Sequence, residues 1–74
     1  MLIKSNLGDF EYDNKNVVRI INPKQRDLYL LNGIMPKDIY TSIDSKTDEK
    51  ILVYIFSKES TQEVYKKWRS YELK

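Results

Sequence analysis

Four apolar residues recur at helical spacing near the C-terminal end of the chain: Val64, Tyr65, Trp68 and Tyr71. This spacing places them on one stripe of a helix, so they predict an amphipathic helix that buries the stripe. The preceding residues 60–63 read Ser-Thr-Gln-Glu, which is typical of a capping box at a helix N-terminus. We therefore expect this helix to begin at Ser60.

A second helix is expected in the middle of the chain. Asn22 is a good N-cap, and Pro23 suits the first helical position because its missing N–H would have no helical partner there. Gly33 predicts the end of this helix, since glycine takes the left-handed conformation without a Cβ clash. Between these signals, we expect Leu28 and Leu31 to face the core.

Alternating residues predict a strand over residues 38–44, with Ile39, Thr41 and Ile43 inward and a wet face that includes Tyr40. Residues 51–56 are apolar on both faces, so they predict the central strand of a sheet. The polar residues 45–49 between these two strands are typical of a hairpin loop.

Residues 17–21 predict a further strand, and residues 1–16 an N-terminal hairpin that turns around residues 6–8. The predicted fold is α+β, in the order β(β)βαββα. Two helices would pack on one face of a small antiparallel or mixed sheet of about three to five strands. We treat residues 1–74 as a single domain, with a βαββα core over residues 17–73.

The chain has 74 residues and contains neither cysteine nor histidine. A domain of this size buries only about 60% of the surface that its unfolded chain exposes. Disulfides are excluded and a structural zinc site is not expected, so association is the remaining route to extra stability. We therefore expect a homodimer, or a monomer that a partner completes. The N-terminus has no signal-peptide pattern and no membrane-length apolar run occurs, so a cytoplasmic location is expected.

No enzyme activity, cofactor or small-molecule substrate is expected from this composition. Without histidine and cysteine, the usual nucleophile–base pairs cannot be built. Asp44, Asp48 and Glu49 cluster in the predicted hairpin loop and raise the question of calcium. However, Lys46 occupies a ligand position and no glycine makes the required turn, so we interpret the cluster as solvated turn residues.

A protein partner is the leading functional hypothesis. The chain has six tyrosines, which bring large contact area at low entropic cost. The sheet face away from the helices is expected to be open and to carry Tyr40 and Tyr54, joined by Tyr12 from the N-terminal hairpin. Half-buried tyrosines without a binding role would give the same pattern.

A nucleic-acid-binding regulator is the alternative hypothesis. It rests on the basic side of the last helix: Lys66, Lys67, Arg69 and Lys74. Such a side can lie along phosphates, but cations near a helix C-terminus also suit the helix dipole. The net charge of +2, from 13 basic and 11 acidic residues, is far below the basic excess of a general nucleic-acid binder.

One further pattern combines residues 22–25 (Asn-Pro-Lys-Gln), residues 36–39 (Pro-Lys-Asp-Ile), residues 53–56 (Val-Tyr-Ile-Phe), Tyr65 and Trp68. On these residues the chain resembles, from Val17 to Leu73, a group of short, uncharacterised proteins of Firmicutes phages and prophages. The resemblance implies an accessory protein of a mobile element, and it does not imply any active-site residues. Proteins of that kind often bind and block a host protein, including CRISPR effectors and other defence systems, so a host protein is the expected target.

Overall fold

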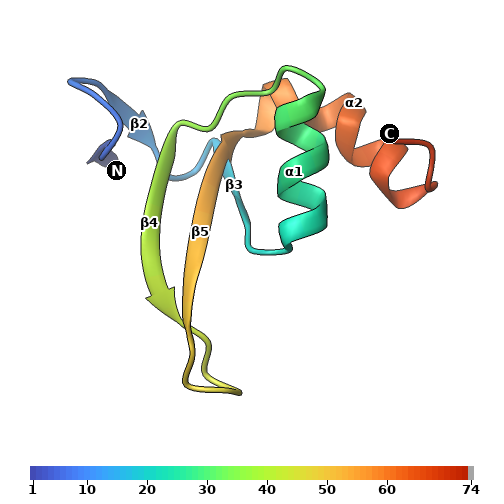
Figure 1. The fold of residues 1–74 in the computed structure, drawn as a ribbon. Helices are drawn as coiled ribbons and strands as arrows, with labels where there is room; N and C mark the ends of the chain where they lie inside the picture. Colours follow the sequence, from blue (N-terminus) through green and yellow to red (C-terminus); the bar gives the residue numbers. More distant parts are fainter. Residues whose placement is uncertain (74) are drawn as a thin grey trace.

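The computed structural model describes residues 1–73 and contains seven regular elements in that part of the chain (Figure 1). In chain order they are β1 (Leu2–Lys4), β2 (Glu11–Asp13), β3 (Val17–Ile20), α1 (Pro23–Leu31), β4 (Asp38–Ile43), β5 (Lys50–Ser57) and α2 (Lys58–Arg69). The predicted α+β class and element order are confirmed.

The strands form two small antiparallel sheets. β1 pairs with β2, and the other three strands lie in the order β3-β5-β4 with β5 at the centre. Tyr54 of β5 lies opposite Ile20 of β3 and Ile39 of β4, which fixes the register of the larger sheet. The predicted central strand is confirmed, since β5 lies between β3 and β4. Its two apolar faces suit this position, because a central strand can be covered on both faces.

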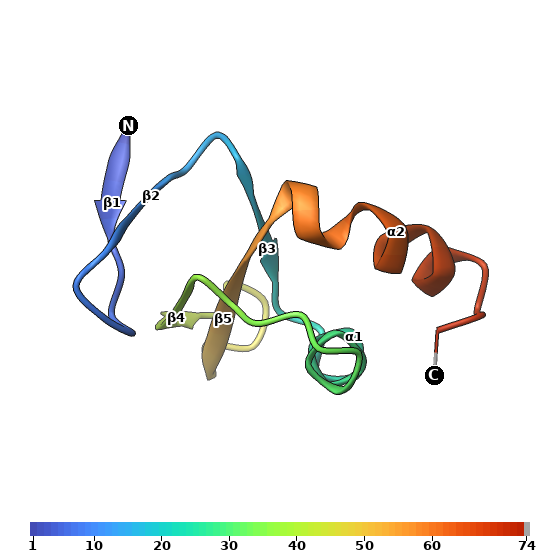
Figure 2. The same ribbon diagram turned by 90° about the horizontal axis from the view of Figure 1, so that it is seen from above.

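Both helices pack on one face of the three-stranded sheet, and the β1–β2 hairpin lies on the other side (Figure 2). On the helix face, Ile20, Tyr29 and Phe56 are buried together, with Trp68 packed against them. On the hairpin face, Tyr12, Val53 and Ile55 form a second, smaller core. The three-stranded sheet is therefore covered from both sides, and the face toward the hairpin is not the open surface that the sequence predicted.

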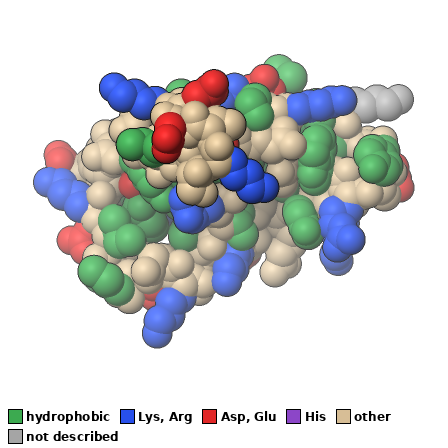
Figure 3. Space-filling view, turned by 90° about the horizontal axis from the view of Figure 1, so that it is seen from below, with side chains coloured by type: hydrophobic (Ala, Val, Ile, Leu, Met, Phe, Trp, Pro, Cys, Tyr) green, Lys and Arg blue, Asp and Glu red, His purple; other side chains and the backbone are tan. Residues whose placement is uncertain are grey.

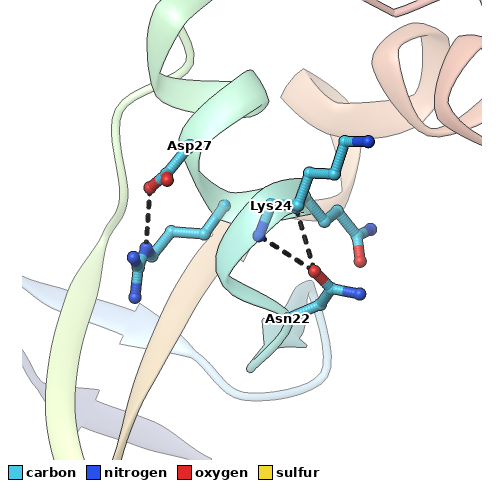
Figure 4. A network of polar contacts seen from close by, with 5 residues as sticks. Asn22, Lys24 and Asp27 are labelled. Atoms are coloured by element: carbon cyan, nitrogen blue, oxygen red, sulfur yellow. Dashed lines mark hydrogen bonds and ion pairs between the residues drawn. The ribbon is translucent and has the colours of Figure 1, made fainter.

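The ends of α1 follow the sequence signals. The Asn22 side chain accepts hydrogen bonds from the backbone N–H groups of Lys24, at 2.9 Å, and Gln25, at 3.2 Å (Figure 4). Gly33 adopts a φ of 83°, and the backbone N–H of Ile34 then donates to the carbonyl of Tyr29 at 3.0 Å. This is the Schellman arrangement expected of a glycine helix stop.

The prediction that Leu28 and Leu31 of α1 face the core was partly wrong. Leu31 is 79% exposed, whereas Tyr29 is completely buried. The Tyr29 ring meets the Phe56 ring edge to face at a centroid distance of 5.4 Å, and its hydroxyl accepts a hydrogen bond from Gln25 at 3.0 Å. A tyrosine with a satisfied hydroxyl buries more apolar surface than a leucine, so the helix presents Tyr29 to the sheet and leaves Leu31 in solvent.

The predicted start of α2 at Ser60 was also wrong. The helix begins at Lys58 with Ser57 as its N-cap, and the Ser57 hydroxyl accepts from the Ser60 amide at 3.5 Å. The cause is that β5 runs straight into α2 with no loop, so the last strand residue becomes the cap. Thr61 is buried and its hydroxyl donates to the Ser57 carbonyl at 2.8 Å.

Tyr71 does not belong to the buried stripe of α2. It lies beyond the helix with a φ of 60° and is 93% exposed. It occupies the position that glycine usually takes in a Schellman motif, and the Glu72 amide donates to the Lys67 carbonyl at 2.8 Å. The turn sends the chain back toward the core, where Leu73 is buried.

The expected alternation of β4 fails at both ends of the strand. Asp38, predicted on the wet face, is only 2% exposed, and Ile43, predicted inward, is 63% exposed. Ile43 lies at the far end of the β4–β5 arm, which extends beyond the helices (Figure 1). Asp38 is buried because the β1–β2 hairpin covers it, and Asn6 and Tyr12 of that hairpin donate hydrogen bonds to it.

Candidate functional site

A buried carboxylate anchors the N-terminal hairpin to the sheet. The Tyr12 hydroxyl donates to Asp38 Oδ2 at 2.7 Å, and the backbone N–H groups of Asn6 and Ile39 each donate to Asp38 Oδ1 at 2.9 Å. Burial raises the pKa of Asp38, but these three donors outweigh burial and hold the pKa below its usual range. The carboxylate is therefore ionised and fully engaged at neutral pH.

The same bond changes the titration of Tyr12. Burial first, and then the hydrogen bond and the negative charge of Asp38, raise the pKa of the Tyr12 hydroxyl to about 12. A tyrosine with this pKa stays protonated and cannot serve as a base near neutral pH. Tyr12 is thus a structural anchor in this fold, and its buried ring offers little surface to a partner.

Two more hydrogen bonds fix the turn between β1 and β2 against the start of β4. The Ser5 hydroxyl donates to the Lys37 carbonyl at 2.6 Å, and the Asn6 side chain donates to the Ile39 carbonyl at 3.3 Å. The hairpin is therefore held at defined points at the start of β4. A hollow remains between the hairpin and the sheet.

This hollow, which we call the hairpin cleft, has a volume of about 520 Å³. Tyr12 and Tyr40 line it together with two cations, Lys4 and Arg19. In the described part of the chain, the one carboxylate that lines the cleft is Asp38, which already accepts hydrogen bonds from three donors. Arg19 therefore carries the positive charge of the cleft, since Lys4 lies opposite Glu11 in the β1–β2 ladder.

A second hollow, the β3 groove, lies on the helix side of β3 and has a volume of about 460 Å³. Val18 and Ile20 of β3 form one wall, and Tyr65 of α2 lies on another. Arg19 and Lys58 line it as well, and no carboxylate of the described residues 1–73 does. The groove thus combines apolar side chains of β3 with two cationic lining residues.

Between the two hollows runs the outer edge of β3, which pairs with no strand among residues 1–73. The Lys58 N–H donates to the Asn16 carbonyl at 3.0 Å, directly before the β3–β5 ladder. Antiparallel ladders alternate between bonded and non-bonded pairs, so Val18 and Ile20 bond inward to β5. The N–H and C=O groups of Val17 and Arg19 consequently point outward from the sheet.

The structure does not bring the three predicted tyrosines onto one surface. Tyr40 lines the hairpin cleft, whereas Tyr54 lies on the helix face, stacked on Phe56 at a centroid distance of 6.3 Å. The guanidinium of Arg26 covers the Tyr54 ring at 5.0 Å. The expectation of a shared open face for Tyr40 and Tyr54 was therefore wrong, because the register places them on opposite faces.

The β3 groove was missed by sequence reasoning. Its two tyrosines, Tyr29 and Tyr65, come from different helices, and no spacing in the sequence predicts that these helices meet beside β3. The one available signal was Arg19, a charged residue inside an otherwise apolar strand. A cation at that position indicates an edge strand, because a central strand could not leave it in solvent.

The basic residues Lys66, Lys67 and Arg69 are exposed on α2, and the Arg69 guanidinium lies 6.0 Å from the Tyr65 ring centroid. Lys74 lies outside the described residues. Trp68 is half-buried against the helix-face core, in agreement with its place on the predicted apolar stripe of this helix. Viewed from below, lysine and arginine side chains are spread between hydrophobic ones and do not gather into one patch (Figure 3).

Within residues 1–73, no three histidine, cysteine, aspartate or glutamate side chains are grouped so that they could hold a metal ion. In the β4–β5 loop, Asp44 Oδ1 accepts a hydrogen bond from the Lys46 amide at 2.9 Å, which is an ordinary turn contact. No helix in the described part of the chain has the length and apolar character to cross a membrane.

No family model matches this chain, and neither a curated protein nor a solved structure is significantly similar to it.

Proposed function

We propose that this chain is a small, non-catalytic binding protein that acts by direct contact with another protein. The observation that carries the proposal is the unpaired edge of β3 between the hairpin cleft and the β3 groove. Two hollows lined by tyrosines on either side of free backbone donors and acceptors suit a polypeptide better than a small molecule. The proposed activity needs no cofactor.

The finer proposal is that the partner is a host protein, which this chain inhibits or modulates. The resemblance to short phage and prophage proteins supports this step, since such proteins often act by blocking a host factor. Defence systems, including CRISPR effectors, are among the proposed targets. The compartment that follows is the cytoplasm of the host cell.

The test is affinity capture with the tagged protein from a Firmicutes host lysate, with and without nuclease, followed by mass spectrometry. We expect one stoichiometric protein that survives nuclease, and its purified form should bind the chain directly. Tyr40→Ala and Tyr65→Ala, one in each hollow, should weaken that binding. Met35→Ala removes an exposed side chain that lines neither hollow and is the matched control. Failure of the purified protein to bind would refute the proposal.

A second candidate function, nucleic-acid binding, is favoured by one specific observation. Tyr71 is an almost fully exposed aromatic residue beside the basic last turn of α2, with Lys67 and Arg69 close in sequence. Exposed aromatic side chains next to cations suit the stacking of single-stranded bases. For this function, fluorescence anisotropy with single-stranded DNA should show an affinity that falls steeply with salt. Lys67→Gln should reduce the salt slope by about one. Salt-insensitive or undetectable binding would remove this candidate.

A further inference from the structure

We propose that the partner contributes an extended, acidic segment that adds to the free edge of β3 as a fourth strand. This inference rests on the proposed protein-binding function and specifies how the partner is recognised. Its basis is the outward direction of the Val17 and Arg19 backbone groups, which the Asn16–Lys58 hydrogen bond fixes. An added strand would satisfy these donors and acceptors in the way that β-augmentation complexes do.

The two hollows lie where the side chains of an added strand must go. Successive residues of a strand point to opposite faces of the sheet, so the added side chains would alternate between the two sides of β3. Residues opposite Val18 and Ile20 would enter the β3 groove, which these two side chains line. Residues opposite Val17 and Arg19 would lie at the mouth of the hairpin cleft. A hollow on each side of one free edge is what alternating side chains require.

The charges select the chemistry of the segment. Arg19 is exposed and lines both hollows, and Lys58 adds charge to the groove. Lys4 lines the cleft as well, but it lies opposite Glu11 in the β1–β2 ladder, so the selecting charges are those of Arg19 and Lys58. Among residues 1–73, no carboxylate lines the groove, and the one that lines the cleft, Asp38, is bound by three donors. An acidic residue opposite Arg19 would form a cross-strand ion pair, and its neighbours in the groove would be apolar. The preferred segment therefore alternates acidic and apolar residues.

A second copy of this chain fits the same edge poorly. Pairing β3 with β3 of another copy would bring both Arg19 side chains, and the lysines beside them, to one seam only four residues long. Like charges at such close range are destabilising. The charge complementarity thus favours an acidic partner over self-association at this edge.

The test uses two synthetic peptides of equal length, one alternating valine with glutamate and the other alternating valine with lysine. In a nitrogen-15 NMR titration of the full chain, the glutamate peptide should shift and protect the amides of Val17 and Arg19. It should bind about tenfold more tightly than the lysine peptide, since the pair at Arg19 changes from attraction to repulsion. Equal affinity for both peptides, or shifts confined to α2 or to the β4–β5 loop, would overturn the proposal.

Variants of Arg19 separate backbone pairing from charge. Arg19→Gln should weaken the glutamate peptide only in part, because it removes the ion pair alone. Arg19→Pro also removes an outward N–H while it leaves the ladder to β5 intact, since proline is tolerated at edge positions whose N–H faces solvent. It should abolish binding with an unchanged circular dichroism spectrum. If Arg19→Pro does not fold, the protection of the Val17 and Arg19 amides by the glutamate peptide in the unaltered chain tests the backbone pairing. Arg19→Glu then tests the charge, because it should reverse the peptide preference.

The outcomes distinguish this inference from the function on which it rests. If a captured partner binds Arg19→Pro as tightly as the unaltered chain, the strand-addition mode is wrong and the protein-binding function stands. If no protein is captured and neither peptide binds, both are wrong. If sedimentation shows a dimer that Arg19→Pro dissociates, a second copy occupies the edge and the acidic-segment proposal is overturned.

Discussion

The Tyr12 hydroxyl lies 2.7 Å from the Asp38 carboxylate, across 26 residues of sequence, and this hydrogen bond joins the N-terminal hairpin to the main sheet. Asp38 is buried only because Tyr12, Asn6 and Ile39 supply its donors. A buried carboxylate without such partners would be strongly unfavourable. The bond therefore decides where the hairpin sits, and the hairpin in turn forms one wall of the cleft beside β3.

Tyr12→Phe should lower the free energy of unfolding by about 1.5–3 kcal/mol, because it leaves a buried, ionised acceptor short of one donor. Urea denaturation followed by circular dichroism measures the change. Tyr71→Phe is the control, since it removes a hydroxyl from a ring that is almost fully exposed. Equal stability of the two variants would contradict the role assigned to the Tyr12–Asp38 bond.

Stability should fall at both extremes of pH. The folded pKa of Asp38 lies below its unfolded value of about 3.9, so its contribution is present above that pH and is lost as pH falls through the folded pKa. The folded pKa of Tyr12, about 12, lies above the unfolded value of 10.0, so its contribution is present below pH 10 and is lost as pH rises toward 12.

The measurement is the free energy of unfolding against pH for the unaltered chain and for Tyr12→Phe. In Tyr12→Phe, the free energy of unfolding should decline less as pH rises. Tyr29 should cause the decline that remains, because burial raises the pKa of Tyr29 as well. If the free energy of unfolding falls identically in both proteins at alkaline pH, Tyr12 is not the titrating group.

Tyr71→Gly should raise the free energy of unfolding by about 1 kcal/mol, because glycine adopts a φ of 60° without the Cβ clash that tyrosine suffers. Glu72→Gly is the matched control: Glu72 does not have a positive φ, so glycine there should only lower stability. If Tyr71→Gly is stabilising and also weakens single-stranded DNA binding, the strained tyrosine is retained for that contact. Destabilisation by Tyr71→Gly would contradict the strain assigned to this turn.

Tyr29→Ala should cost about 3–5 kcal/mol, because it empties the centre of the helix-face core beside Phe56. Leu31→Ala should change stability by no more than about 0.5 kcal/mol, since that side chain is exposed. The pair tests which face of α1 meets the sheet, and thermal unfolding of both variants measures it. Similar losses for the two substitutions would mean that the helix is rotated differently.

The homodimer expected from the small core stays a prediction. Exposed apolar side chains such as Ile43 and Leu52 on the β4–β5 arm give it a surface that is distinct from the β3 edge. Light scattering at tens of micromolar should give twice the mass of one chain. A monomer at that concentration would contradict the expectation, and Ile43→Lys, which should dissociate a dimer built on this arm, identifies the surface.

The sequence by itself determined the local elements, because their causes are local. Asn22 and Pro23 start α1 and Gly33 stops it through backbone geometry that depends on a few neighbouring residues. The apolar residues 51–56 determined the central strand, since only a strand covered on both faces can dispense with a polar face. The N-terminal β1–β2 hairpin and the β4–β5 hairpin followed from the same kind of local signal.

The tertiary structure alone decided what each side chain faces. The burial of Asp38 depends on donors more than 25 residues away, and the exposure of Leu31 depends on Tyr29 reaching Phe56. The separation of Tyr40 from Tyr54 follows from the ladder register, because a shift of one residue exchanges the two faces of a strand. The candidate site also depends on tertiary structure, because it consists of the free edge of β3 and the hollow on each side of that edge.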